Sequence, residues 1–177
     1  MTPETTAWYV QHDRPNKTDT PVLAPYALGQ TEAPVGFTTG AKIVTTRGAR
    51  SVEDIRPGDH IITRSSGIVP VQHVEQQSVL TRAIYVIAGS IGHHQLTRDT
   101  MLPAGQAVLV RDWRARALGG HREIIAPASA LADGEFVRDI GFQLMTLHRL
   151  YCGAPQVIYA DGMELLSAAA TVEMQTG

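Results

Sequence analysis

Nucleophilic side chains are the first groups to consider, and Thr38, Thr39 and Cys152 stand out. In an acyl shift, a hydroxyl attacks the carbonyl of the residue before it, so Thr38 would attack Phe37 and Thr39 would attack Thr38. Each attack needs a general base and a distorted peptide bond, and the sequence marks neither. Both threonines are therefore weak catalytic candidates, and we expect them to satisfy a turn or a strand edge. Cys152, the single cysteine, is expected to be a small buried hydrophobic residue rather than a nucleophile.

Histidines raise the question of a metal site, because His93 and His94 are adjacent. Neighbouring residues on a strand point to opposite faces, so this pair does not easily chelate one ion. A site would need His121, Asp99 or His148 to be brought close by the fold, whereas zinc ligands usually show tighter spacing. We therefore predict a solvated loop at this pair, and no metal.

A basic and aromatic segment, RDWRAR at residues 111–116, is a candidate patch for nucleic acid or for a protein partner. Asp112 offsets part of its charge, and the whole chain has a net charge of -2, which does not favour a polyanionic partner. We expect the segment to cap a strand and to continue into a loop at Gly119 and Gly120. No segment matches a phosphate-binding loop or a dinucleotide fingerprint, so we predict no nucleic-acid partner and no cofactor.

The elements that position these residues are predicted to be short β-strands. Short apolar or β-branched runs alternate with Gly and Pro turns, and almost nothing shows helical periodicity. The predicted strands are 42–46, 60–63, 69–74, 83–87, 107–110, 142–150, 156–159 and 163–166. This pattern predicts an all-β fold with many non-local strand pairings.

Two local features are more specific. Asp161-Gly162 separates the last two predicted strands, and this dipeptide favours a primed hairpin turn, which needs positive φ at both central residues. The alanine-rich segment 126–132 is the one convincing short helix, because Pro127 is tolerated in a first turn and Asp133-Gly134 provides a stop.

The predicted organisation is a flexible arm over residues 1–35, one domain over 36–167 and a tail over 168–177. The arm is polar and contains several prolines. Its Trp8 and Tyr9 are expected to pack on the domain surface, and the alternative is a short recognition motif for another protein. No apolar run reaches the roughly 18 residues of a membrane helix, and the N-terminus lacks a signal-peptide pattern. We therefore expect no membrane association and a cytoplasmic location, and signal-less secretion stays open.

The sequence from Gly36 to Asp59 resembles the opening of bacterial Hedgehog/intein (Hint) domains. Its GFTTGAKI and TRGARSVEDIRPGD segments follow the family pattern Cys-Phe-x-x-Gly-Thr, a strand, a turn and then Val-Glu-Asp-Leu-x-Pro-Gly-Asp. The segment from Leu102 to Val110 stands where the family has Ser/Thr-x-x-His before an apolar strand. The segment from Val157 to Gly162 resembles the closing hairpin. The resemblance implies an all-β horseshoe of many short, curved strands, with pseudo-symmetric halves and one short helix.

The same resemblance implies self-cleavage or self-splicing chemistry, and it shows which residues are replaced. Active members begin with a cysteine that attacks the preceding carbonyl, and the histidine of the second motif protonates the departing amide nitrogen. Here Gly36 stands at the cysteine position, Gln106 at the histidine position and Pro103 at the Ser/Thr position. Glycine has no side chain, a glutamine amide does not exchange protons near neutral pH, and proline has no hydroxyl.

We therefore predict a non-catalytic binding or structural module, with bacterial secreted or surface proteins as the context that the resemblance implies. The alternative is a self-cleaving domain that uses Thr38 or Thr39. An unidentified protein partner stays open, and the expected oligomeric state is a monomer or a weak homodimer. If the correspondence with the family is right, Gly36 should lie beside Gln106 in the folded chain.

Overall fold

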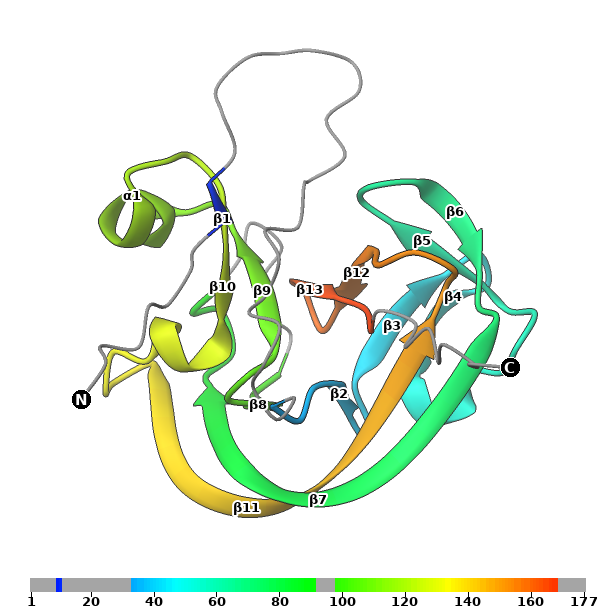
Figure 1. Ribbon diagram of the computed structural model, residues 1–177, viewed down its shortest axis with the longest axis horizontal. Coiled ribbons are helices and arrows are strands. Elements are labelled where there is room, and N and C mark those ends of the chain that lie inside the picture. Colours follow the sequence, from blue (N-terminus) through cyan, green and yellow to red (C-terminus); the bar gives the residue numbers. More distant parts are fainter. Residues whose placement is uncertain (1–8, 11–32, 92–97, 169–177) are drawn as a thin grey trace, which may run out of the picture.

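A computed structural model describes residues 9–10, 33–91 and 98–168, and these form two antiparallel sheets (Figure 1). The larger, nine-stranded sheet has the order β1-β10-β9-β13-β12-β3-β5-β6, with β4 paired to β3. Its strands are β1 (Tyr9–Val10), β3 (Lys42–Thr45), β4 (Gly48–Ser51), β5 (His60–Thr63), β6 (Gly67–Pro70), β9 (Ala107–Val110), β10 (Ile124–Pro127), β12 (Val157–Ala160) and β13 (Met163–Leu166). The four-stranded sheet has the order β2-β11-β7-β8. It contains β2 (Phe37–Thr38), β7 (His73–Val86), β8 (Thr100–Pro103) and β11 (Val137–Tyr151).

The two long strands, β7 and β11, form a curved antiparallel ribbon that runs around the molecule as an arc (Figure 1). The short strands lie inside and on both sides of this arc, which gives the all-β horseshoe that the resemblance implies. The register of the ribbon shifts between Asp139 and Phe142, at Gly141. A bulge of this kind bends a strand and increases its twist, and Gly141 has the positive φ of 77° that such a position favours.

The main core fills the space that the arc encloses. Its members come from distant parts of the chain, for example Ile43, Ile61, Val108, Ile124 and Ile158, each at most 1% exposed. A smaller cluster of Ala83, Met145 and Leu147 lies on the ribbon itself. The β2 strand pairs with β11 through Thr38 and Leu147 and through Phe37 and His148. This pairing carries the start of the domain to the inner part of the ribbon, where the candidate site lies.

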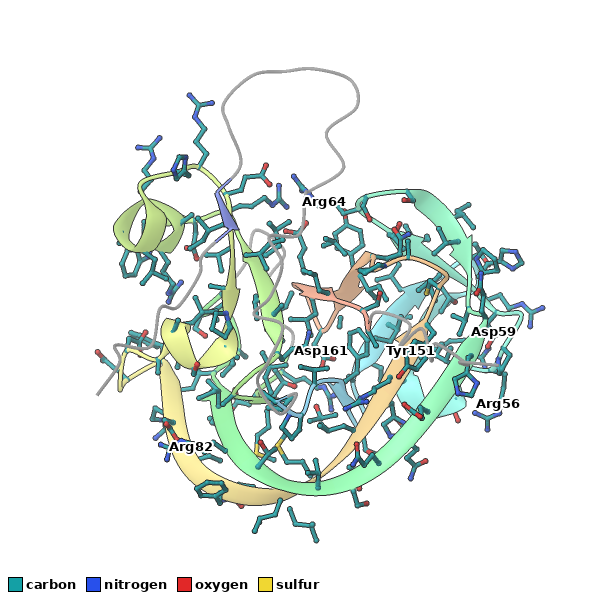
Figure 2. The ribbon with its side chains drawn as sticks, viewed as in Figure 1. Arg56, Asp59, Arg64, Arg82, Tyr151 and Asp161 are labelled. Atoms are coloured by element: carbon teal, nitrogen blue, oxygen red, sulfur yellow. The ribbon has the colours of Figure 1, made fainter. Side chains whose placement is uncertain are left out.

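The closing hairpin was predicted correctly. Ala160 pairs with Met163 across a two-residue turn, in which Asp161 has φ 51° and Gly162 has φ 85°. The Asp161 side chain, labelled in Figure 2, accepts hydrogen bonds from the backbone N–H of Lys42 and from the guanidinium of Arg98. These bonds fix the hairpin against β3, so local turn chemistry and tertiary contacts agree at this position.

The predicted helix over 126–132 is wrong in place and type. Ile124–Pro127 is the strand β10, which pairs with β9, and Ala128–Leu131 is a 3-10 helix. The α-helix α1 lies instead at Trp113–Gly119, in the segment for which we predicted a strand cap and a loop. Asp112 caps α1 by accepting a hydrogen bond from the N–H of Arg114, which is the usual role of aspartate at a helix start.

The long ribbon was also underestimated. The predicted strand 69–74 is divided between β6 and the beginning of β7, and the predicted strand 83–87 is only the end of β7. The residues between, Glu75 to Ser78, are polar and exposed. A ribbon segment with both faces in solvent lacks the apolar alternation by which strands are recognised.

Most of the predicted arm and tail lies outside the described residues, as does Trp8. Tyr9–Val10 forms the short strand β1, which pairs with Ile125 and Ile124 of β10. No helix in the described ranges is long and apolar enough to cross a membrane.

Candidate functional site

Gly36 and Gln106, which stand at two catalytic positions of the family, contact each other in the structure. The backbone N–H of Gly36 donates a hydrogen bond of 2.9 Å to Oε1 of Gln106, across 70 residues of sequence. Gln106 is 1% exposed, so this contact is shielded from water. The predicted convergence of Gly36 and Gln106 is thus observed, and it places the beginning of the domain against the turn between β8 and β9.

Both the oxygen and the nitrogen of the Gln106 side-chain amide have hydrogen-bond partners. Its Nε2 donates to the carbonyl of Leu166 at 2.9 Å and to the carbonyl of Ala107 at 3.0 Å. Its backbone N–H donates to Pro103, which orients the turn. One buried side chain therefore connects the beginning of the domain at Gly36 with the end of its last strand at Leu166.

The residues just before Gly36 lie against the same turn. The carbonyl of Val35 accepts a hydrogen bond of 3.2 Å from Nε of Arg149, which lies on β11. A Cβ atom added to Gly105 would come within 2.7 Å of the Ala33 side chain, so the turn has no room for a larger residue there. The peptide bond between Val35 and Gly36 is consequently held on both sides, by Arg149 at its carbonyl and by Gln106 at its N–H.

Gly36 also has a backbone that disfavours any side chain. Its φ is 145°, and an added Cβ would lie 3.0 Å from the carbonyl oxygen of His148 and 3.1 Å from Cβ of Leu147. L-residues rarely adopt this φ, and contacts this close require the neighbours to shift. In this conformation the position lacks a nucleophile and also the space to hold one without strain.

The two candidate threonines, Thr38 and Thr39, differ in their surroundings. Thr38 lies in β2, and its hydroxyl donates to the carbonyl of Met101 at 2.9 Å. This is the strand-edge role that we expected. Thr39 lies in the turn after β2, is exposed, and has its hydroxyl 2.9 Å from Nε2 of His148. A histidine that the sequence alone did not connect with Thr39 is therefore adjacent to its hydroxyl.

The environment of the His148 imidazole favours its neutral form. It is 3% exposed, and burial lowers its pKa, against the opposing effect of the Glu53 carboxylate. Glu53 accepts a hydrogen bond of 2.8 Å from the N–H of Gly40, which lowers the pKa of its carboxyl. A neutral imidazole next to a hydroxyl is able to accept its proton, with the direction of the bond set by the tautomer. From the sequence we considered His148 only as a remote metal ligand, because its contact with Thr39 depends on the pairing of β2 with β11.

The remaining candidates have structural roles. Cys152 is buried, as predicted, and burial raises the pKa of its thiol to about 11. The carboxylate of Asp99 accepts from the hydroxyl of Tyr85 and from the N–H of Ala88. No group of three or more potential metal ligands occurs within the described ranges, and His93 and His94 lie outside them.

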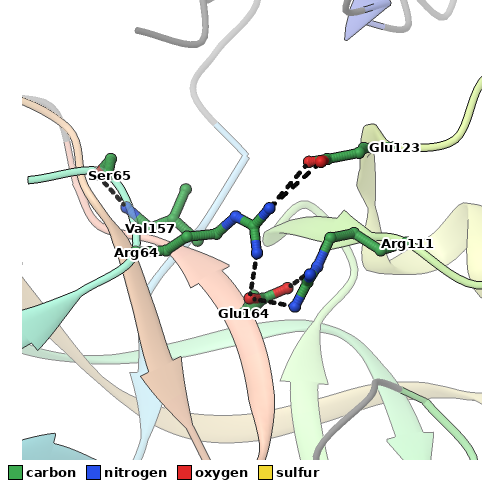
Figure 3. Close-up of polar contacts among 6 residues, drawn as sticks. All are labelled: Arg64, Ser65, Arg111, Glu123, Val157 and Glu164. Carbon is green, nitrogen blue, oxygen red and sulfur yellow. Dashed lines mark hydrogen bonds and ion pairs between the residues drawn. The ribbon is translucent and has the colours of Figure 1, made fainter. Parts of the chain in front are cut away.

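Arg111 and Arg114 of the basic segment are engaged within the molecule. Figure 3 shows Arg111 and Arg64 on either side of Glu164, whose side chain is 8% exposed. Arg111 contacts both carboxylate oxygens of Glu164 at 2.8 Å, and Arg64 also contacts Glu123 at 3.2 Å. Arg114 lies over the Trp113 ring and pairs with Asp112. These contacts pair the charges of Arg111 and Arg114 within the molecule, whereas Arg116 is exposed.

Comparison with known proteins agrees with this architecture. A family model described as "Hint domain" matches residues 35–171. A solution structure of a bacterial intein-like domain from Clostridium thermocellum is similar, with a TM-score of 0.51 and 13% identity, over 77% of this chain and all of that chain. The MchDnaB-1 intein has a TM-score of 0.47 and 12% identity, over 75% of this chain and all of that one. No curated protein matches the chain. From the family match over most of its length, the chain belongs to the Hint domain family.

Proposed function

We propose that this Hint domain leaves its own backbone intact and works as a binding or structural module. The observation that carries the proposal is the state of the peptide bond between Val35 and Gly36. Arg149 binds its carbonyl, Gln106 binds its N–H, and the position after the carbonyl has no side chain. These are ordinary stabilising contacts around a bond that autoprocessing relatives would break.

The chemistry of the contacts supports this conclusion. A backbone acyl shift needs a nucleophile on the residue after the attacked carbonyl, and Gly36 provides none. The leaving amide nitrogen needs a proton, and the amide of Gln106 accepts a hydrogen bond from that nitrogen instead of supplying one. Two separate steps of the reaction therefore have no group to perform them at this bond.

A structural role follows from the position of Gln106. Its side chain contacts Gly36 at one end of the domain and Leu166 at the other. Segments that precede and follow the domain would consequently leave it side by side. We propose that the domain holds these flanking segments together, or presents them to a protein partner.

The test is the intact mass of the purified full chain after long incubation with hydroxylamine or with a thiol. The expected result is an unchanged mass of 19.1 kDa. An active intein treated in the same way provides the positive control. A new fragment that begins at Gly36 would contradict the proposal.

Self-cleavage through Thr39 is the second candidate, favoured by its contact with His148. It would break the bond between Thr38 and Thr39, so its fragment would begin at Thr39. That bond is held in regular hydrogen bonds, because the Thr38 carbonyl accepts from Ala41 and the Thr39 N–H donates to Thr146. These hydrogen bonds oppose the distortion that an acyl shift requires, and the same mass measurement distinguishes the two cleavage points.

A further inference from the structure

We propose that Thr39 and His148 form a nucleophile and general-base pair that accepts an acyl group from an external activated ester or thioester. The inference goes beyond the proposed function, because it breaks no backbone bond and concerns a side chain on the other side of β2 from Gly36. The ligand class is a small acyl donor with a good leaving group.

The geometry of the pair is fixed by the backbone. His148 pairs with Phe37, and the N–H of Thr39 donates to the carbonyl of Thr146. The hydroxyl of Thr39 lies 2.9 Å from Nε2 of His148 in this frame. A nucleophile within hydrogen-bond reach of a base is the arrangement that covalent catalysis requires, and a fixed backbone reduces the entropy lost in reaching it.

Of the two residues, His148 is buried and Thr39 is exposed. The imidazole of His148 is 3% exposed, so water competes little for its nitrogen. Thr39 is exposed at the turn, so an external molecule has access to its hydroxyl. A buried base behind an accessible nucleophile favours reaction with an external group over reaction with the well-bonded peptide bond beside it.

Charged groups adjoin the pair. The Glu53 carboxylate accepts from the N–H of Gly40, the residue after Thr39. On the same residue, the guanidinium of Arg98 donates to the Gly40 carbonyl. These contacts hold the backbone of Gly40 at both its N–H and its carbonyl, directly after Thr39, while the Arg98 charge itself is paired with Asp161.

The reaction proceeds in two steps, acylation of Thr39 and hydrolysis of the resulting ester. Oγ1 of Thr39 attacks the acyl carbonyl carbon, and its proton passes to Nε2 of His148. The bond from the acyl carbon to the leaving group breaks, and the leaving group takes the proton from His148. The products are an ester on Thr39 and the free alcohol or thiol. Water then attacks the ester with His148 again as the base, which releases the acid and restores the hydroxyl.

The experiment treats the folded full chain with p-nitrophenyl acetate and maps the acetylated residues by peptide mass spectrometry. We expect one acetyl group on Thr39 in samples quenched with acid before water hydrolyses the ester. Thr39→Val, which replaces the hydroxyl by a methyl group, should reduce the label on this peptide to background, whereas Thr39→Ser should retain it. Thr38→Val is the matched control, because the Thr38 hydroxyl is bound to Met101, and it should leave the labelling of Thr39 unchanged.

His148→Gln tests the base, because glutamine can keep a hydrogen bond to Thr39 but does not take its proton. We expect the rate of acetylation at Thr39 to fall by about 100-fold, the low end of the contribution of a general base. Should this variant fail to fold, mapping in the Thr39 variants still decides the question. Acetylation confined to lysines or the N-terminus, or an equal rate in folded His148→Gln, would overturn the proposal. A label without chain cleavage separates this result from failure of the proposed function.

Discussion

The two ends of strand β2 have opposite chemical character, although they lie almost side by side. Before the strand, the N–H of Gly36 meets the amide of Gln106, a group that neither takes nor gives a proton near neutral pH. After the strand, the hydroxyl of Thr39 meets the imidazole of His148, which does exchange protons in that range. The comparison shows that one short strand joins two positions with chemically different partners. Three predictions test how far the two ends differ.

The largest expected effect comes from Gln106→Ala. This change removes hydrogen bonds to the N–H of Gly36 and to the carbonyls of Leu166 and Ala107. Each buried polar group without a partner costs about 1–3 kcal/mol, so we expect a loss of about 3 kcal/mol or more in the free energy of unfolding, measured by urea denaturation. Gln76→Ala, at an exposed position on β7, is the matched control and should change stability by less than about 0.5 kcal/mol. Equal effects of the two substitutions would show that Gln106 does not hold the two ends of the domain together.

A smaller effect is expected from Gly36→Ala, compared with Gly48→Ala. Both glycines have positive φ, 145° and 92°, but an added Cβ meets close neighbours only at Gly36. Backbone strain alone costs about 1–3 kcal/mol, so both variants should lose stability, and Gly36→Ala should lose more because it also displaces His148 or Leu147. The difference between the two melting temperatures measures the steric part. If Gly36→Ala were as stable as the parent, the position would accept a side chain and its loss of a nucleophile would be easy to reverse.

The smallest expected effect is the pH dependence that His148 contributes. Burial lowers its pKa in the folded chain below the ordinary value of 6.5, so the unfolded chain binds the proton more strongly. The stability that this neutral histidine contributes is therefore present above about pH 6.5 and is lost as the pH falls from there through the folded pKa, with each pKa unit of difference worth about 1.4 kcal/mol. Urea midpoints between pH 7.5 and 5 measure it.

The control for this pH effect is His148→Gln, in which the loss in that window should shrink. The lowered pKa of Glu53 acts below its ordinary value of 4.5 and does not overlap with the histidine window. A parent protein whose stability is flat between pH 7 and 5 would mean that the imidazole is not desolvated as described, which would weaken the proposed role of His148 as a base.

Several elements could be predicted from the local sequence alone. His60–Thr63 and Ala107–Val110 are strands with the predicted bounds, because short apolar runs between turns have few alternatives. The Asp161-Gly162 turn was equally clear, since few residues tolerate positive φ. The family motifs also indicated which positions to compare, namely Gly36 and Gln106, and the fold then brought them into contact.

Other features depended on the tertiary structure. The polar middle of β7 is a strand only because β11 pairs with it along its whole length, which no local pattern encodes. The segment at 126–132 forms the end of β10 and a 3-10 helix instead of an α-helix. The pairing of β10 with β9 outweighed the helix preference of its alanines. The contact of Thr39 with His148 spans 109 residues. The sequence by itself determined the all-β class of fold and the glycine at position 36, because both follow from residue types in order. Only the tertiary structure decided which hydroxyl meets a base, because that depends on which strands are brought together.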